Sequence, residues 1–227
     1  MKRILALVAT GLLVILLAST TVLAVAGAIA NTKHNLATSG PNADAKSTDE
    51  DEICVFCHTP HNARVAVPLW NRDASPATYT TYTSSTIDGT RDTITGSSPN
   101  ISVLCLSCHD GAISLGAVVN NYPDATDPTI TGSHTTAGKL SSGRALLGID
   151  LTNDHPIAIT YNTTPGDLVA PDANGLVAST CQLFKTGGTG EWKVECASCH
   201  SVHNNTYAPF LRASNAGSAL CLKCHIK

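Results

Sequence analysis

Residues 196–200 read Cys196-Ala197-Ser198-Cys199-His200, and the same arrangement of two cysteines, two intervening residues and a histidine occurs four times in the chain. Eight of the nine cysteines and four of the nine histidines in the 227 residues belong to these copies. Because the spacing and the adjoining histidine are the same in every copy, the four copies are expected to share one chemical task. They lie at Cys54–His58, Cys105–His109, Cys196–His200 and Cys221–His225.

This pattern is the attachment signature of c-type haem. The two thiols add to the two haem vinyl groups, and the histidine that follows lies under the iron as its proximal ligand. A zinc site made from two CxxC pairs does not require a histidine after every second cysteine, and a disulfide framework does not require one fixed spacing. The sequence therefore predicts four covalently bound haem c groups. Their predicted attachment residues are Cys54, Cys57, His58, Cys105, Cys108, His109, Cys196, Cys199, His200, Cys221, Cys224 and His225.

The composition limits the ligand on the other side of each iron. The only methionine is Met1, so the histidine–methionine ligation of small electron carriers is excluded. Each iron therefore has a second histidine, a weak ligand or an open position. Five histidines lie outside the four motifs, and four bis-histidine haems would need four of them. The five are His34, His61, His134, His155 and His203.

Two of these histidines occupy a repeated context. Residues 54–62 read CVFCHTPHN and residues 196–204 read CASCHSVHN, so His61 and His203 each follow a proximal histidine by three residues. Neither can reach the far side of its own haem, because the proximal histidine already lies on one side of that ring. Each is therefore predicted to ligate the iron of a neighbouring haem, which would bring two haems close together. A surface histidine is the alternative for each.

The remaining candidates have weaker contexts. His155 precedes a proline, which restricts the backbone to extended conformations and favours a rigid turn, although an ordinary loop histidine is the alternative. His34 lies four residues beyond residue 30, on a segment with no apolar face of its own. His134 has the least distinctive context and is taken as the histidine that ligates no iron. Cys181, the ninth cysteine, is expected to be a small buried apolar side chain rather than a reactive thiol.

Residues 1–30 have the composition of an export signal. Lys2 and Arg3 precede a long uncharged stretch, and Ala28-Ile29-Ala30 is a small-x-small cleavage site. The stretch is also long enough to span a bilayer as an uncleaved anchor. We expect a cleaved signal followed by one tetrahaem domain over residues 31–227, with 12 basic and 17 acidic side chains. No basic patch is visible, so nucleic acid is not an expected partner.

The ten aromatic residues are few for a chain of this length. The expected fold class is a multihaem cytochrome c, mostly coil with short helices at the haem sites and a few short strands, folded around four haems. Locally, the sequence predicts a helix over 101–116 and a helical turn over 218–225. It also predicts a surface loop over 72–100 and, from the glycines near residue 188, a hairpin over 182–195.

Taken together, these features resemble the OmcE-type extracellular cytochromes. The matching segments are Lys33-His34-Asn35, CHTPHN at 57–62, Asp154-His155-Pro156 and CHSVHN at 199–204. In that family, secreted tetrahaem subunits polymerise into filaments whose unbroken chain of haems exports electrons to minerals or other cells. The resemblance implies bis-histidine haems with His34, His61, His155 and His203 as distal ligands. It also favours His34 as a ligand that is supplied to a haem of the next subunit.

The expected function is electron transfer without substrate chemistry, in an exported protein located outside the cell, at its surface or in the periplasm. The expected partners are further copies of the chain, other redox cytochromes and extracellular electron acceptors. Two alternatives remain at this point. One is a membrane-anchored tetrahaem quinol dehydrogenase of the NapC/NrfH type, which would keep residues 4–30 as its anchor. The other is a multihaem reductase with one open iron.

Overall fold

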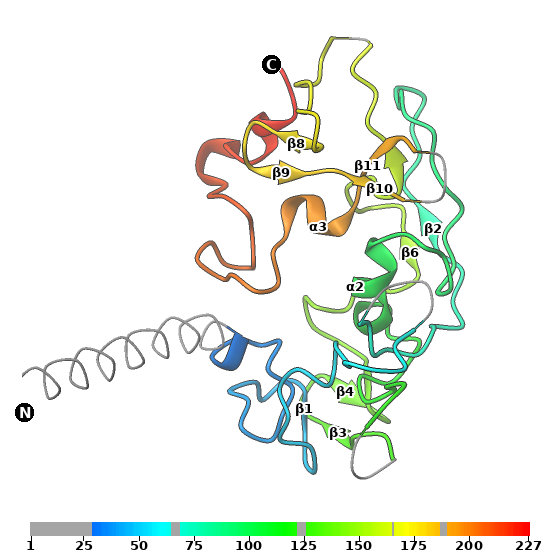
Figure 1. The fold of residues 1–227 in the computed structure, drawn as a ribbon, viewed down its shortest axis with the longest axis vertical. Coiled ribbons are helices and arrows are strands. Elements are labelled where there is room, and N and C mark those ends of the chain that lie inside the picture. Colours follow the sequence, from blue (N-terminus) through cyan, green and yellow to red (C-terminus); the bar gives the residue numbers. More distant parts are fainter. Residues whose placement is uncertain (1–28, 65–68, 122–125, 165, 187–189) are drawn as a thin grey trace, which may run out of the picture.

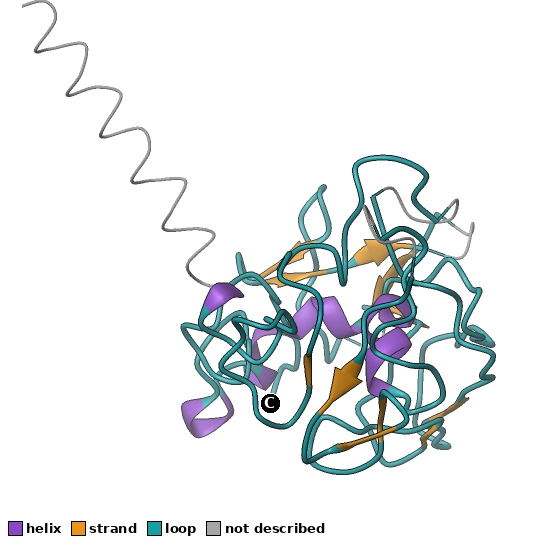
Figure 2. Cartoon of the chain, turned by 90° about the horizontal axis from the view of Figure 1, so that it is seen from below, coloured by secondary structure: helices purple, strands orange, loops and turns teal. Residues whose placement is uncertain are grey.

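The computed structural model describes residues 29–64, 69–121, 126–164, 166–186 and 190–227 (Figure 1). The predicted export signal lies outside these residues, apart from its last two positions. Most of the described chain is loop and turn, with a few short helices and strands (Figure 2). This agrees with the coil-rich fold that the sequence predicts. Among the described residues, no helix is both long enough and apolar enough to cross a membrane.

The strands are two or three residues long and fasten loops to one another. In the described part of the chain they form a three-stranded antiparallel sheet, β10-β11-β7, and four two-stranded sheets. β1 pairs with β3, β4 with β5 and β8 with β9, all antiparallel, whereas β2 and β6 are parallel. The bounds are β1 Lys46–Ser47, β2 Thr80–Thr81, β3 Ile130–Thr131, β4 Thr135–Thr136, β5 Lys139–Leu140, β6 Asp150–Leu151, β7 Ile159–Thr160, β8 Leu176–Val177, β9 Cys181–Gln182, β10 Phe184–Lys185 and β11 Trp192–Val194.

The helices carry haem motifs. Helix α2, Ser102–His109, contains the whole second motif, and the single turn α3, Cys196–Cys199, begins the third. Two 3-10 turns follow near the C-terminus, η1 (Ala216–Ser218) and η2 (Cys221–Lys223), and the second of them begins the fourth motif. Helix α2 ends where Gly111 takes a φ of 68°, a left-handed conformation that costs glycine little.

Several local predictions can be compared with the structure. The hairpin over 182–195 is confirmed by the pairing of β10 with β11, and its glycines at 187 and 188 lie outside the described residues. The terminal turn over 218–225 is confirmed by η2. The helix predicted over 101–116 is shorter than expected, since Gly111 stops it. The loop predicted over 72–100 is irregular over most of its length and exposed at many positions, but it also buries Arg72, Tyr79 and Ile94, so it is not a surface loop throughout.

Arg72 anchors the start of the segment 72–100 in the interior of the protein. Its side chain is fully inaccessible to solvent. The guanidinium donates hydrogen bonds to the backbone carbonyls of Ser107 and Ser114, each at 2.7 Å, and to that of Leu115. A buried guanidinium is tolerated only where its donors find acceptors. These carbonyls lie at and just beyond the end of α2, so Arg72 fixes the position of the second haem motif.

The apolar core is divided into three small clusters, each next to haem-motif residues. Partly buried Cys57 and Cys108 pack on the first cluster, Leu106 of the second motif belongs to the second, and Cys199 and Cys224 pack on the third. The attachment sites therefore lie where the chain is best packed. The buried members are Ala37, Ala45, Phe56, Leu115, Ile130 and Leu140; then Tyr79, Ile94, Leu106, Leu151 and Ala158; then Val177, Cys181, Leu183 and Leu220.

Candidate haem sites

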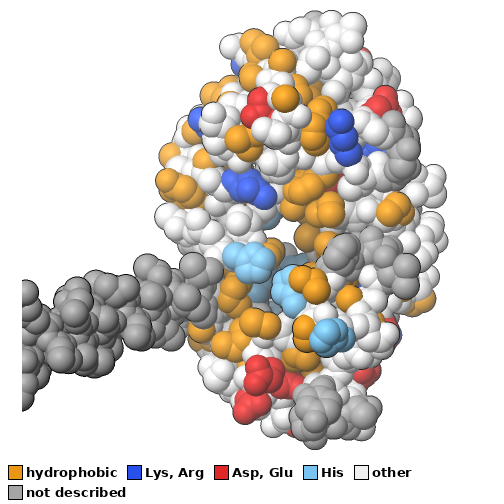
Figure 3. Space-filling view, viewed as in Figure 1, with side chains coloured by type: hydrophobic (Ala, Val, Ile, Leu, Met, Phe, Trp, Pro, Cys, Tyr) orange, Lys and Arg blue, Asp and Glu red, His pale blue; other side chains and the backbone are white. Residues whose placement is uncertain are grey.

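Three of the four proximal histidines have the ring of a second histidine about 6 Å away. Each pair combines a motif histidine with one of the histidines predicted as distal ligands. Histidine side chains gather across the middle of one face of the molecule, around a hollow between its two halves (Figure 3). The distances between ring centres are 6.1 Å for His58 and His203, 6.1 Å for His109 and His34, and 6.4 Å for His225 and His155.

These spacings suit two imidazoles that share one iron. A metal–imidazole bond is about 2.0 Å long and the ring centre lies about 1.1 Å further, so opposite ligands have ring centres about 6.2 Å apart. All three observed spacings lie close to this value. The residues of the chain therefore fit haem groups held between two histidines, with the paired cysteines of each motif as covalent attachment points.

His34 is held within its own chain, which corrects the expectation of a segment with no apolar face. Its ring packs against Phe210 at 4.3 Å between ring centres, in addition to its contact with His109. Leu36 and Ala37 of the same segment pack in the first apolar cluster, and polar contacts add to this. The side-chain amide of Asn35 donates to the carbonyl of Ala30 at 2.9 Å, and that of Asn42 donates to the carbonyl of Lys33 at 3.1 Å.

The environment of His34 suits an uncharged metal ligand. Burial lowers the pKa of its imidazole to about 4, and the nearby histidines 109, 200 and 203 act in the same direction. The ring is therefore neutral at physiological pH, and the neutral imidazole is the form that binds metal. Its Nδ1 atom is buried and has no hydrogen-bond partner among the described residues. His34 thus lacks the carbonyl partner that orients the Nδ1 atoms of His109 and His200.

Other histidines are oriented by backbone carbonyls. The Nδ1 atom of His109 donates to the carbonyl of Ala145 at 2.6 Å, and the Nδ1 atom of His200 donates to the carbonyl of Pro209 at 3.0 Å. In His155 it lies 2.9 Å from the carbonyl of the following proline. A hydrogen bond of this kind fixes the ring and leaves Nε2 for the metal. Burial also lowers the pKa of His109 and of His58, which favours the neutral imidazole in both.

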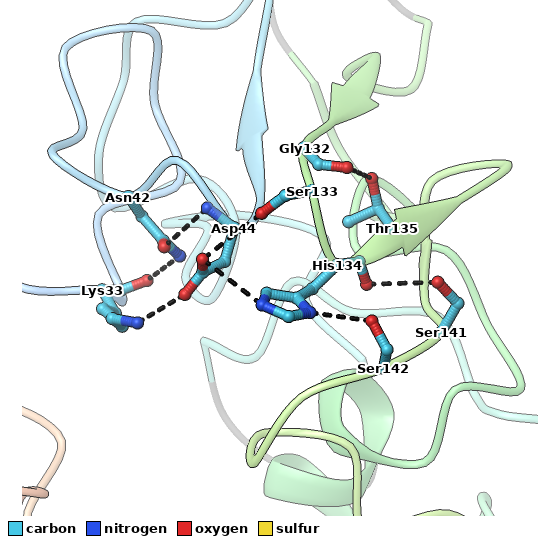
Figure 4. A network of polar contacts seen from close by, with 9 residues as sticks. All are labelled: Lys33, Asn42, Asp44, Gly132, Ser133, His134, Thr135, Ser141 and Ser142. Carbon is cyan, nitrogen blue, oxygen red and sulfur yellow. Dashed lines mark hydrogen bonds and ion pairs between the residues drawn. The ribbon is translucent and has the colours of Figure 1, made fainter.

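His134 is engaged elsewhere (Figure 4). Its Nε2 atom lies 3.6 Å from a carboxylate oxygen of Asp44, and its Nδ1 atom lies 2.7 Å from the hydroxyl of Ser142. Asp44 also accepts a hydrogen bond from Lys33 and one from the hydroxyl of Ser133. Both ring nitrogens of His134 thus face partners that belong to this surface network rather than to a haem motif.

His61 and His200 are the two histidines that remain. Both are exposed, and neither forms a ring pair with another histidine within the described residues. The loop that carries His61 is nevertheless fixed, because its backbone carbonyl accepts hydrogen bonds from Thr59 at 2.8 Å and from Asn120 at 3.0 Å. The structure therefore pairs three of the four predicted distal histidines with a proximal histidine, and within the described residues it leaves the proximal histidine of the third motif without a paired ring.

The first three haem motifs are neighbours in the order of the sequence. Cys57 and Cys108 pack on the same apolar cluster, so the first and second motifs are close. The amide of Cys196 donates a hydrogen bond to the hydroxyl of Ser102 in α2 at 2.9 Å, which joins the second motif to the third. Sequence spacing carried no signal for this order, because the contacts are made between distant parts of the chain.

Cys181 joins the third and fourth motifs. It is 1% exposed and belongs to the third apolar cluster, so the prediction of a buried side chain is confirmed. Cys199 of the third motif and Cys224 of the fourth motif both pack on this cluster, so Cys181 lies between the two motifs. The sequence alone gave no sign of this bridging position.

Comparison with known families agrees with the chemistry of these sites. Residues 190–227 match a family model described as a doubled CXXCH motif, and this segment holds the third and fourth motifs. No curated protein matches the chain. The region over 190–227 is therefore of the multihaem c-type cytochrome kind, in which CXXCH motifs bind haem c covalently and the bound haems transfer electrons.

Proposed function

We propose that the protein is a secreted tetrahaem electron carrier whose subunits polymerise into extracellular filaments for electron export. The observation that carries this proposal is the set of three histidine pairs at 6.1–6.4 Å. An iron with two histidine ligands has no open position for a substrate, so it exchanges electrons only. Bis-histidine ligation also gives haem a lower potential than histidine–methionine ligation, which suits electrons leaving the cell for external acceptors.

The order of the motifs in space supports electron transfer along a row of haems. Cys57 and Cys108 pack on one apolar cluster, the amide of Cys196 is bound by Ser102 at the start of α2, and Cys199 and Cys224 pack on another cluster. Because electron tunnelling decays steeply with the distance between cofactors, close attachment points favour fast transfer along such a row. The haems themselves supply the redox chemistry, and the chain supplies their ligands, their spacing and their apolar surroundings.

We further propose that assembly completes the fourth ligand pair. The exposed His61 of one subunit would bind the iron above His200 of the next, so that each subunit contact contains an iron–histidine bond. This replaces His34 as the intersubunit ligand, because His34 lies against His109 in its own chain. An intersubunit bond of this kind would offset the repulsion between acidic subunits and would continue the haem row across their boundary.

A specific observation also favours a second candidate function. Since His200 has no distal histidine in its own chain, a haem on the third motif could keep an open iron and reduce a small substrate such as nitrite or hydroxylamine. The test is addition of carbon monoxide to the reduced, assembled protein, followed by absorption spectroscopy. The electron-carrier proposal predicts no change in the spectrum. Binding of carbon monoxide to one haem, together with turnover of such a substrate, would overturn it in favour of a reductase.

A further inference from the structure

The side chain of Glu195 lies between the helices that carry the second and third haem motifs. It is only 1% exposed. One carboxylate oxygen accepts two hydrogen bonds from Ser102, one from its backbone amide at 3.1 Å and one from its hydroxyl. The other accepts from the hydroxyl of Thr186 at 2.7 Å and from the amide of Asn100 at 3.3 Å. A carboxylate surrounded by donors in this way is in its ionised, acceptor-only form.

This single side chain caps two helices. At α2, its carboxylate accepts the backbone amide of Ser102, the first residue of the helix. At α3, it forms a reciprocal capping box with Ser198, whose hydroxyl accepts the backbone amide of Glu195 at 3.0 Å. The Ser102 hydroxyl in turn accepts the amide of Cys196 at 2.9 Å. Glu195, Ser102 and the amide of Cys196 thus form one chain of hydrogen bonds between the two motif helices.

The buried lysine close to Glu195 in the chain, Lys193, forms its ion pair with another carboxylate. Lys193 is fully buried and pairs with both oxygens of Asp92 at 2.6 Å. Asn100 connects this ion pair to Glu195, since its amide also donates to Asp92 at 2.8 Å. No ion pair of Glu195 with a lysine or arginine occurs within the described residues. The charge of Glu195 is thus stabilised by neutral donors, and in a buried site it is screened far less than a surface charge.

We propose that Glu195 is a positioning residue that sets both the relative placement and the reduction potentials of the haems on the second and third motifs. Its hydrogen bonds hold the two helices together, and its buried negative charge stabilises the oxidised, more positive form of the adjacent irons. It therefore lowers the potentials of these two haems relative to the other two. The proposal rests on haem attachment at both motifs and is independent of filament formation.

The charge of Glu195 lies beside the attachment point of the third motif. Its carboxylate accepts the hydroxyl of Ser102, and the same hydroxyl accepts the amide of Cys196. A negative charge at this position favours positive charge on a nearby iron. The charge and the capping contacts can be separated experimentally, because different substitutions remove one or the other.

The test is spectroelectrochemical titration of the full-length, haem-loaded protein with Glu195→Gln. The amide keeps the size of the side chain but removes its charge, so the potentials of two of the four haems should rise while the other two stay unchanged. Glu52→Gln is the matched control, because Glu52 is exposed and also closely precedes a haem motif. It should shift none of the potentials. A shift of all four haems, of none, or an equal shift in the control would overturn the proposal.

A second variant keeps the proposal testable if Glu195→Gln does not fold. Thr186→Val preserves shape but removes one donor to the carboxylate, leaving more of the negative charge uncompensated. The same two haem potentials should therefore fall, the opposite sign to Glu195→Gln. A variant whose packing was only weakened would show no such reversal of sign. An unchanged or raised potential would contradict the proposal.

Haem content, measured by mass spectrometry before titration, separates this proposal from the proposed function. If unmodified protein lacks haem on the second or third motif, the proposed function fails. If all four haems are present and the potentials do not respond, only the role of Glu195 fails. The Soret circular dichroism, which reports haem–haem geometry, should change in Ser102→Ala, because that variant breaks the link between α2 and α3 but retains the charge. An unchanged signal would contradict the positioning role.

Discussion

Residues 54–62 and 196–204 have almost the same local pattern but different surroundings. In the second segment, His203 lies 6.1 Å from His58, so it completes a ligand pair with the proximal histidine of the first segment. In the first segment, His61 is exposed and forms no such pair with His200. If sequence pattern alone decided ligation, the two segments would exchange ligands symmetrically. They do not.

The difference shows that the pattern creates a candidate ligand and that tertiary contacts decide which iron it reaches. The carbonyls of His61 and Asn62 are both bound by the side chain of Asn120, which fixes this loop at the surface. In the other segment, the side chain of Asn204 binds Thr206 within its own loop. In the proposed assembly, one segment ligates a haem of its own chain and the other ligates a haem of another subunit.

The largest expected effect comes from His203→Ala. The haem on the first motif would lose its distal ligand within the chain, so the variant should have one more high-spin haem than the unmodified protein, in filaments and in isolated subunits alike. Absorption and electron paramagnetic resonance spectra would report the change. Four low-spin haems in this variant would show that His203 does not ligate that iron and would remove the basis of the comparison.

His61→Ala should act on assembly alone. The variant should form no filaments, as judged by electron microscopy, while its spectrum should equal that of dissociated subunits of the unmodified protein. The physical reason is that His61 has no iron to bind until a second subunit is present. If the variant instead gains a high-spin haem relative to those dissociated subunits, His61 pairs with His200 inside one chain.

Asn120→Ala should weaken assembly without touching the haems. It removes the side chain that donates to the carbonyls of His61 and Asn62, at 3.0 and 2.9 Å, and that also bonds the side chains of Asn62 and Thr59; each such bond contributes about 1 kcal/mol. Assembly affinity should fall by roughly tenfold or more, since 1.4 kcal/mol corresponds to a factor of ten. Sedimentation over a concentration series would measure this. Asn204→Ala, the matched change in the other segment, should leave assembly unchanged, and equal effects would refute the distinction between the loops.

The smallest effect is expected for His134→Ala. Its ring contacts Asp44 and Ser142 at a partly exposed position, so its loss should reduce the free energy of unfolding by about 1 kcal/mol or less. The haem spectrum should not change, because neither contact belongs to a haem motif. Ser142→Ala is the control for the lost hydrogen bond. A high-spin haem in His134→Ala would make His134 a ligand and would reopen the assignment of all five histidines.

The sequence predicted those features that depend on local chemistry. Four haem motifs, the coil-rich fold and the hairpin before Cys196 follow from spacing, composition and glycines. The pairing of His203 with His58 could not be predicted, because the two residues are 145 positions apart and the contact depends on the folded chain. The burial of Arg72 and Glu195 was missed for the same reason: charged residues are normally exposed, and only their distant partners explain the exception.

The most direct test of this account is the haem spin state of the oxidised protein, measured by low-temperature electron paramagnetic resonance in assembled filaments and again after dissociation into subunits. The account predicts four low-spin haems in the filament and three in the isolated subunit, where the iron above His200 has lost the histidine of its neighbour. A high-spin signal in intact filaments would contradict the saturated electron carrier. Four low-spin haems in the isolated subunit would contradict ligation across the subunit boundary.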